Sequence, residues 1–129
     1  MSTIKTETLS TPSNATVPVD TVVNGTAKAW VNFNGSGTVA IRRAFNVASI
    51  TDNGNGDYTV NFTTAMPDAN YSAMVAGSRY VTTPNWYVPF TACHDDAVLA
   101  NSCRIQSNVW NAYPANLQDI PLIMVAIFS

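Results

Sequence analysis

Residues 47–63, VASITDNGNGDYTVNFT, decide the fold class of this chain. Tyr58, Val60 and Phe62 share one face of an extended segment, and the Thr and Asn residues between them share the other, as in a half-buried antiparallel strand. The preceding segment 47–52 pairs with it across residues 53–57, whose glycines can supply the positive φ of a hairpin loop. The stretch therefore predicts a β-hairpin.

The same alternation continues on both sides of this hairpin. Residues 29–33 (AWVNF) and 38–45 (TVAIRRAF) predict a second hairpin across the turn at 34–37 (NGSG). No stretch shows convincing helical periodicity. We therefore expect an all-β fold, a small antiparallel β-sandwich of jelly-roll-like or Ig-like type with about seven to nine strands. Further strands are expected at residues 71–77, 80–82, 86–88, 103–106 and 122–128.

The first 26 residues differ in composition from the rest. They are rich in Thr, Ser and Pro and carry few large apolar side chains, and Pro12 and Pro18 disfavour a helix. We expect residues 1–26 to form an extended N-terminal attachment arm and residues 27–129 to form the β-sandwich domain. The arm would lie along a neighbouring subunit or tether the domain to something larger; the alternative is a loose tail.

Composition narrows the class of partners. The chain has 129 residues, enough for one domain, and only 11% of them are charged, against roughly 25% in an ordinary soluble domain. A surface of Thr, Ser and Asn suits an extracellular or particle-borne protein. The net charge of −2, with six Lys and Arg residues spread along the chain, leaves no basic stripe for a phosphate backbone, so we expect no nucleic acid partner.

The chain ends suggest where the protein is made. The N-terminal segment MSTIKTE has no apolar stretch of the kind a secretion signal needs. The longest apolar run, residues 120–128, is too short to span a bilayer and is interrupted by Pro121. We expect synthesis in the host cytoplasm without a signal peptide and no membrane insertion.

The last strand has apolar residues on both faces. Residues 121–128, PLIMVAIF, can fill the core with one face only. Another subunit could cover the second face. Alternatively, the strand is central and is covered on both sides within one chain.

Groups with catalytic or metal-binding potential are few. His94 is the single histidine, and the run His94-Asp95-Asp96 is interpreted as a solvated polar turn rather than a metal site. Glu7 is the single glutamate and lies in the arm, and no carboxylate pair with the setting of a general acid and base is recognisable. The glycine-rich stretches match no phosphate-binding motif. We expect no enzyme, no catalytic residue, no cofactor and no metal.

Cys93 and Cys103 flank a polar segment that we interpret as a hairpin loop. Such a loop would bring the two thiols close enough to form a disulfide in an oxidising medium. Two buried thiols are the alternative, favoured by the missing secretion signal.

Aromatic residues in loop-like sequence are the candidates for recognition. They offer large contact area at low entropic cost, together with a polar group, and both sugar-binding and protein-binding surfaces use them. The alternative is that the rings cap the core. The candidate surface-binding residues are Tyr80, Trp86, Tyr87, Trp110 and Tyr113.

Two consecutive runs carry a family resemblance. Residues 23–42, VNGTAKAWVNFNGSGTVAIR, and residues 45–71, FNVASITDNGNGDYTVNFTTAMPDANY, resemble a module of tailed-bacteriophage structural proteins, the terminal domain of phage tail fibres and related virion appendages. The match covers about two-fifths of the chain. Residues 72–129 match nothing in that module, as expected of a variable, partner-facing half.

The resemblance implies a virion protein that assembles with copies of itself, commonly as a homotrimer. It implies that residues 1–26 attach to other virion proteins and that loops of the 77–118 region contact a host cell-surface glycan or protein. Long tail fibres carry a shaft of repeats before this domain, and here only the arm precedes it. The alternative is therefore a capsid decoration or head-fibre protein that binds the shell through its arm.

Overall fold

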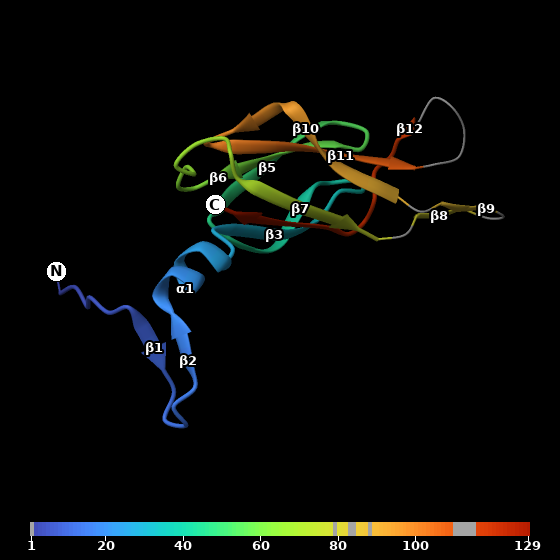
Figure 1. The fold of residues 1–129 in the computed structure, drawn as a ribbon. Helices are drawn as coiled ribbons and strands as arrows, with labels where there is room; N and C mark the ends of the chain where they lie inside the picture. Colours follow the sequence, from blue (N-terminus) through green and yellow to red (C-terminus); the bar gives the residue numbers. More distant parts are fainter. Residues whose placement is uncertain (1, 79, 83–84, 88, 110–115) are drawn as a thin grey trace.

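The computed structural model describes residues 2–78, 80–82, 85–87, 89–109 and 116–129. Two antiparallel sheets pack face to face (Figure 1), in the strand orders β10-β11-β6-β5, with β12 beside β11, and β4-β3-β13-β7. The predicted all-β sandwich is thereby confirmed, with nine strands in the described part of the chain. These are β3 (Ala29–Asn34), β4 (Ala40–Phe45), β5 (Val47–Gly54), β6 (Asp57–Phe62), β7 (Ser72–Gly77), β10 (Pro89–Leu99), β11 (Ser102–Val109), β12 (Asn116–Leu117) and β13 (Ile123–Phe128).

Two smaller units extend from the sandwich. The N-terminal arm holds a two-stranded hairpin, β1 (Thr8–Ser10) with β2 (Thr16–Pro18), followed by the short helix α1 (Val19–Gly25). A second hairpin pairs β8 (Tyr80–Thr82) with β9 (Asn85–Tyr87). Among the described residues, no helix has the length and hydropathy that a membrane span requires.

Both predicted hairpins are present. In β5–β6, Ile50 pairs with Val60, and Gly54 and Gly56 of the connecting turn have φ of 128° and 64°. The positive φ explains why the sequence places glycine at these two positions. In β3–β4, Trp30 pairs with Phe45, and a register shift follows Asn32.

The core lies between the two sheets and comes from every second residue of the central strands. Alternation along a strand sends these side chains to one face, which is the pattern that the sequence displays. All of them belong to residues 29–127, so the arm contributes nothing to the core. The buried apolar residues are Ala29, Val31, Phe33, Tyr58, Val60, Phe62, Met66, Cys103, Ile105, Ile120, Ile123, Val125 and Ile127.

Tyr58 joins the core to three connecting segments. Its ring is fully buried and meets Phe33 edge-on, with ring centroids 5.3 Å apart. Its hydroxyl lies 2.7 Å from the Gly35 carbonyl oxygen and 2.8 Å from Oδ1 of Asp119, which also accepts the Gly56 N–H at 2.7 Å. Burial, followed by the hydrogen bond to Asp119, raises the pKa of Tyr58 above its usual value. The neutral phenol therefore ties the 34–38, 53–57 and 117–120 segments together.

Two local predictions are wrong. The arm contains helix α1 directly after Pro18, because a proline before the first turn removes an N–H that the helix does not use. The segment His94–Asp96 is not a turn but lies inside strand β10. The hairpin loop that joins β10 to β11 lies at residues 100–101, and a register irregularity between Cys93 and Val98 accommodates the polar run.

A glycine pair tests the packing of the 53–57 turn. Gly56 and Gly37 both have positive φ, 64° and 66°, but a Cβ on Gly56 would lie 2.4 Å from the Gln118 nitrogen, whereas nothing lies within 4 Å at Gly37. We expect Gly37→Ala to lower the free energy of unfolding by about 1 kcal/mol for the backbone conformation alone. Gly56→Ala should cost several times more, at least about 3 kcal/mol, because backbone must also move. Urea denaturation of both variants measures the difference; equal losses would contradict the packing.

Candidate binding surfaces

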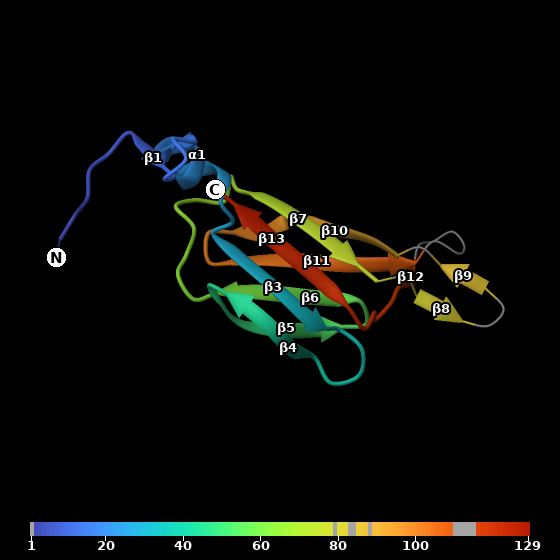
Figure 2. The ribbon, with the colours of Figure 1, turned by 90° about the horizontal axis from the view of Figure 1, so that it is seen from below.

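The molecule has two distinct ends. The arm leaves the sandwich at one end, and the β8–β9 hairpin extends from the opposite end, in both views of the ribbon (Figures 1 and 2). The strands of the sandwich run between these ends. A contact made by the arm and a contact made by the β8–β9 hairpin are therefore separated by the length of the domain.

The structure brings part of the predicted aromatic set together. Tyr80 lies on β8 and is the register partner of Tyr87 on β9, next to the pair formed by Val81 and Trp86. The side chains of these residues lie outside the described part, as do Trp110 and Tyr113 altogether. The backbone thus gathers Tyr80, Trp86 and Tyr87 on one hairpin at the distal end.

The two cysteines lie on neighbouring strands. The register pairs Cys93 with Ile105 and Cys103 with Val98, so the cysteines occupy diagonal rather than directly opposite positions. Cys103 is fully buried, and the Cys93 side chain lies outside the described residues. The disulfide and the pair of buried thiols both remain predictions.

One sheet exposes an apolar surface to solvent. We call it the outer face: the outward-pointing residues of β4-β3-β13-β7, on the side away from the core. Met74 is 66% exposed, Phe45 55% and Met124 41%. The outward side of an ordinary antiparallel sheet is polar. Contiguous apolar surface of this kind is uncommon on monomeric soluble proteins and is typical of interaction sites. Its apolar residues are Trp30, Phe45, Met74, Ala76, Met124, Ala126 and Phe128.

The outer face is hollowed along its middle. A groove with a volume of ≈ 510 Å³ lies on it, and larger side chains, among them Trp30, Met74 and Phe128, line it beside Ala76 and Ala126. The small alanines between larger neighbours produce the depression. The groove can receive side chains of a partner but offers few groups for hydrogen bonding.

The other sheet shows the opposite pattern. Its outward residues on β5, β6 and β11 are uniformly polar, and they hydrogen-bond to one another across the strands. Asn61 donates to the hydroxyls of Ser49 and Thr51, at 3.1 and 2.9 Å. This face behaves as a normal solvated sheet surface. The outward residues are Ser49, Thr51, Asn53, Asp57, Thr59, Asn61, Ser102, Arg104 and Gln106.

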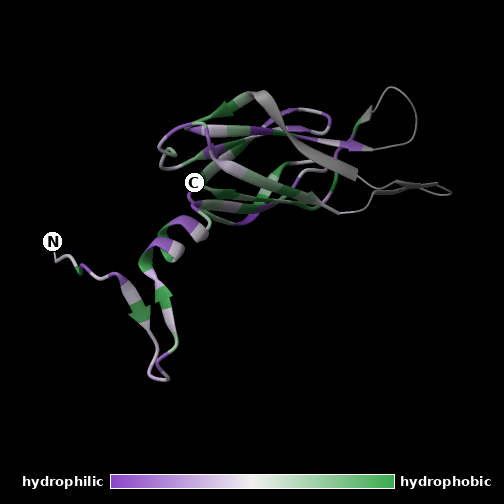
Figure 3. Ribbon diagram, viewed as in Figure 1, coloured by the Kyte–Doolittle hydropathy of each residue, from purple (hydrophilic) through white to green (hydrophobic). Residues whose placement is uncertain are grey.

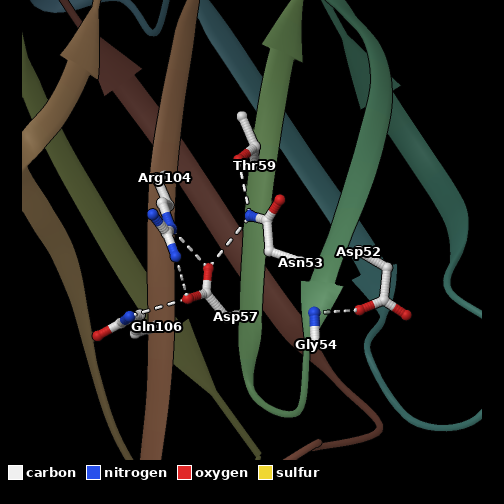
Figure 4. Close-up of polar contacts among 7 residues, drawn as sticks. All are labelled: Asp52, Asn53, Gly54, Asp57, Thr59, Arg104 and Gln106. Carbon is white, nitrogen blue, oxygen red and sulfur yellow. Dashed lines mark hydrogen bonds and ion pairs between the residues drawn. The ribbon is translucent and has the colours of Figure 1, made fainter.

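Asp57 is the centre of this polar face (Figure 4). Arg104 donates to both carboxylate oxygens, from Nε at 2.8 Å and Nη2 at 2.6 Å. Gln106 donates from Nε2 at 2.9 Å, and Asn53 from Nδ2 at 3.1 Å. Each oxygen thus accepts two hydrogen bonds, so the carboxylate is saturated by side chains of its own protein.

The charge of Asp57 is stabilised by these donors. The hydrogen bonds from Arg104 hold its pKa at about 2, below the usual 3.8, against the upward effect of burial. The same contact raises the pKa of Arg104. A carboxylate that stays ionised and fully bonded is poorly suited to act as a general acid or base at neutral pH. The cluster instead fastens the β5–β6 turn to β11.

The described residues contain no group of three or more His, Cys, Asp or Glu side chains that could hold a metal ion. Comparisons of the chain with family models, with curated protein sequences and with solved structures give no match.

The structure places Tyr80, Trp86 and Tyr87 on one hairpin, and their role in binding stays a prediction. The sequence signal for the outer face is the double-sided apolar pattern, which is described above for residues 121–128. Residues 72–77, SAMVAG, carry the same signal, with apolar residues at even and odd positions. The alternation in residues 29–33 does not say which face Trp30 lies on, and the register places Trp30 and its partner Phe45 on the outer side. The Asp57 cluster joins residues 47 positions apart, which no local pattern predicts.

Asp57→Asn tests the cluster. A lowered pKa in the folded state means that the charge stabilises the fold above about pH 4, and that this contribution is lost as the pH falls from about 4 toward 2. We expect Asp57→Asn to lower the free energy of unfolding by about 1–3 kcal/mol at pH 7. Urea denaturation at pH 2–7 should show that the gap between wild type and variant narrows across this window. A gap that is constant with pH would contradict the role assigned to the charge.

Proposed function

We propose that this chain is a bacteriophage virion structural protein, the tip module of a tail fibre or related appendage, which attaches non-covalently to the host surface. The observation that carries the proposal is the separation of the arm and the β8–β9 hairpin at opposite ends of the domain (Figure 1). A protein that links a virion to a host cell needs two separate contact sites, one for the virion and one for the cell. The arm serves the particle, and the distal hairpin serves the host.

The arm has the properties of an attachment segment. Helix α1 has no buried residue, and Ile4 and Leu9 are 90% and 48% exposed. A seven-residue helix and a two-stranded hairpin are each marginal in water without packing partners. The arm therefore gains stability when it packs on another protein, and the sandwich core does not depend on it.

The outer face supports assembly with further copies of the chain. Obligate interfaces between subunits are more apolar than ordinary surface and resemble a core cut in half. The groove between Trp30, Met74 and Phe128 has this character. A homo-oligomer, with three copies as the resemblance implies, would remove the face from water and present several distal hairpins to one surface, which raises avidity.

A non-enzymatic role fits the polar groups that the structure describes. Asp57 is saturated by Arg104, Gln106 and Asn53, and Asp119 accepts from Tyr58 and Gly56. Both carboxylates serve the connections between strands. Binding, rather than bond cleavage, is the activity that we assign to this domain.

A capsid decoration or head-fibre protein is the second candidate. The observation that favours it is that the arm joins β3 directly, so the sandwich would lie close to the surface to which the arm binds. Both candidates use the arm for attachment. They differ in the place of the chain on the particle.

Removal of the arm tests attachment. We expect a chain lacking residues 2–26 to keep the sandwich fold, because the buried core lies entirely within residues 29–127, but to be lost from purified particles. Circular dichroism and urea denaturation of the shortened chain control for folding. Electron cryomicroscopy of particles with the full chain locates it: density at the distal end of a tail appendage supports the first candidate, and density on the capsid lattice supports the second. Particles without the chain would contradict both.

The distal hairpin is tested by substitution. We expect Trp86→Ala together with Tyr87→Ala to reduce binding of the full chain to host cells by at least about tenfold, since aromatic anchors dominate such contacts. The control is Leu99→Ala, which removes an exposed apolar side chain on β10, outside both the distal hairpin and the outer face. Flow cytometry with fluorescently labelled protein measures the binding. Loss of binding in the control but not in the double variant would move the host contact to another surface.

A further inference from the structure

Two apolar surfaces in this chain lack a cover, and they differ in charge. The first is the outer face of the β4-β3-β13-β7 sheet. The second is the arm segment formed by β1, β2 and α1, which points away from the domain in both ribbon views (Figures 1 and 2). The two surfaces are compared below in apolar character and in charge.

The arm segment is apolar on one side of its hairpin. Leu9 and Val17 are register partners, and together with Ala15 they line a hollow of ≈ 240 Å³. Figure 3 shows the apolar patches on β1 and β2. Helix α1 adds three valines, of which Val23 is 52% exposed. This side can pack on a surface that offers protruding apolar side chains, as Met74 and Phe45 do on the outer face.

The charges of the two surfaces are complementary. The four strands of the outer face contain no acidic residue, and their charged residues are Arg42 and Arg43. The arm carries Glu7 and Asp20, which lie close together because the Val19 N–H donates to the Glu7 carbonyl oxygen at 2.9 Å. The acidic residues sit beside the apolar hairpin, and the arginines sit beside the apolar groove. Two copies of the outer face would instead bring arginines together, which disfavours direct face-to-face packing.

The arm is held away from the outer face of its own chain. Lys28, at the start of the sandwich, donates from Nζ to the carbonyl oxygens of Val23 and Thr26. The Thr26 hydroxyl donates to the Val22 carbonyl oxygen at 2.8 Å. These bonds connect the end of α1 to Lys28, the residue just before β3, and the arm points away from the sandwich in both ribbon views (Figures 1 and 2). In this arrangement the arm does not cover the outer face of its own chain.

We propose that residues 7–25 of one copy dock on the outer face of a second copy. This arm exchange deepens the proposed function, on which it rests only in assigning the arm a role in assembly. Each copy offers one arm segment and one outer face, and the exchange leaves no surface unpaired when the rotation between copies closes into a symmetric assembly. Residues 2–6 project beyond the docked segment and remain for contact with the particle.

Complementation between two variants tests the exchange. Leu9→Glu places a charge in the arm hollow, and Met74→Glu places one on the outer face. We expect each variant alone to be monomeric in sedimentation velocity, where the wild-type chain is oligomeric. A mixture of the two should form a 1:1 complex, since it retains one intact arm and one intact face. An oligomeric Leu9→Glu variant, or a mixture that stays monomeric, would overturn the exchange.

Matched controls separate docking from non-specific effects of charge. Ile4→Glu alters the arm outside residues 7–25, and Leu99→Glu alters a 51% exposed residue on the other sheet. Both should associate as the wild type does. All four positions are at least 48% exposed, so the substitutions should leave the monomer folded, and circular dichroism checks this.

A charge reversal tests the electrostatic contribution to docking of the arm. We expect Asp20→Arg and Arg43→Asp each to weaken self-association by roughly tenfold at low salt, and the double variant to recover most of the loss. Additive losses in the double variant would contradict the pairing of arm acids with face arginines.

A wild-type chain that is monomeric at all concentrations overturns the exchange. It leaves the proposed place of the chain on the virion unaffected, because microscopy tests that place separately. A chain that oligomerises through the exchange but is absent from particles overturns the virion assignment alone.

Discussion

The buried hydroxyl of Tyr58 is the contact on which the sandwich most depends. The Tyr58 ring packs edge-on against Phe33 of the opposite sheet, and its oxygen meets Gly35 and Asp119 at the end of the core. A phenol in this position must be hydrogen-bonded, because a buried polar group without a partner destabilises the fold by more than a typical hydrogen bond stabilises it. This oxygen therefore connects the 34–38 and 117–120 segments, and Asp119 extends the connection to Gly56 in the 53–57 turn.

The outward faces of the two sheets differ in polarity. On one sheet, polar side chains bond to each other around Asp57, and the face is stable in water. On the other, Met74, Met124 and Phe45 are left exposed. Water-exposed apolar area is unfavourable by roughly 25 cal/mol per Å², so the second face gains stability from a partner, and the first does not. This asymmetry is the reason for proposing that one side serves assembly and the other faces solvent.

The arm and the outer face both lack a packing partner within the described part of the chain. Neither α1 nor the β1–β2 hairpin contributes a residue to the core, and neither is long enough to be stable by itself. A segment of this kind orders fully when it packs on a preformed surface, and a rigid sheet provides one. The proposed arm exchange would satisfy both, since the arm would pack on a sheet and the outer face would be covered.

Local periodicity and turn chemistry are sufficient to predict the β5–β6 hairpin around Gly54 and Gly56, the strand 123–128 and the all-β class. It did not determine the helix after Pro18 or the length of β10, where local signals are weak and packing decides. Only the tertiary structure revealed the side of the sheet on which Trp30 lies. Alternation along a strand defines two faces but does not indicate which of them is buried. A face becomes the inner one only when a second sheet covers it. The Asp57–Arg104 contact likewise requires β6 and β11 to pair, and that pairing is a property of the whole fold.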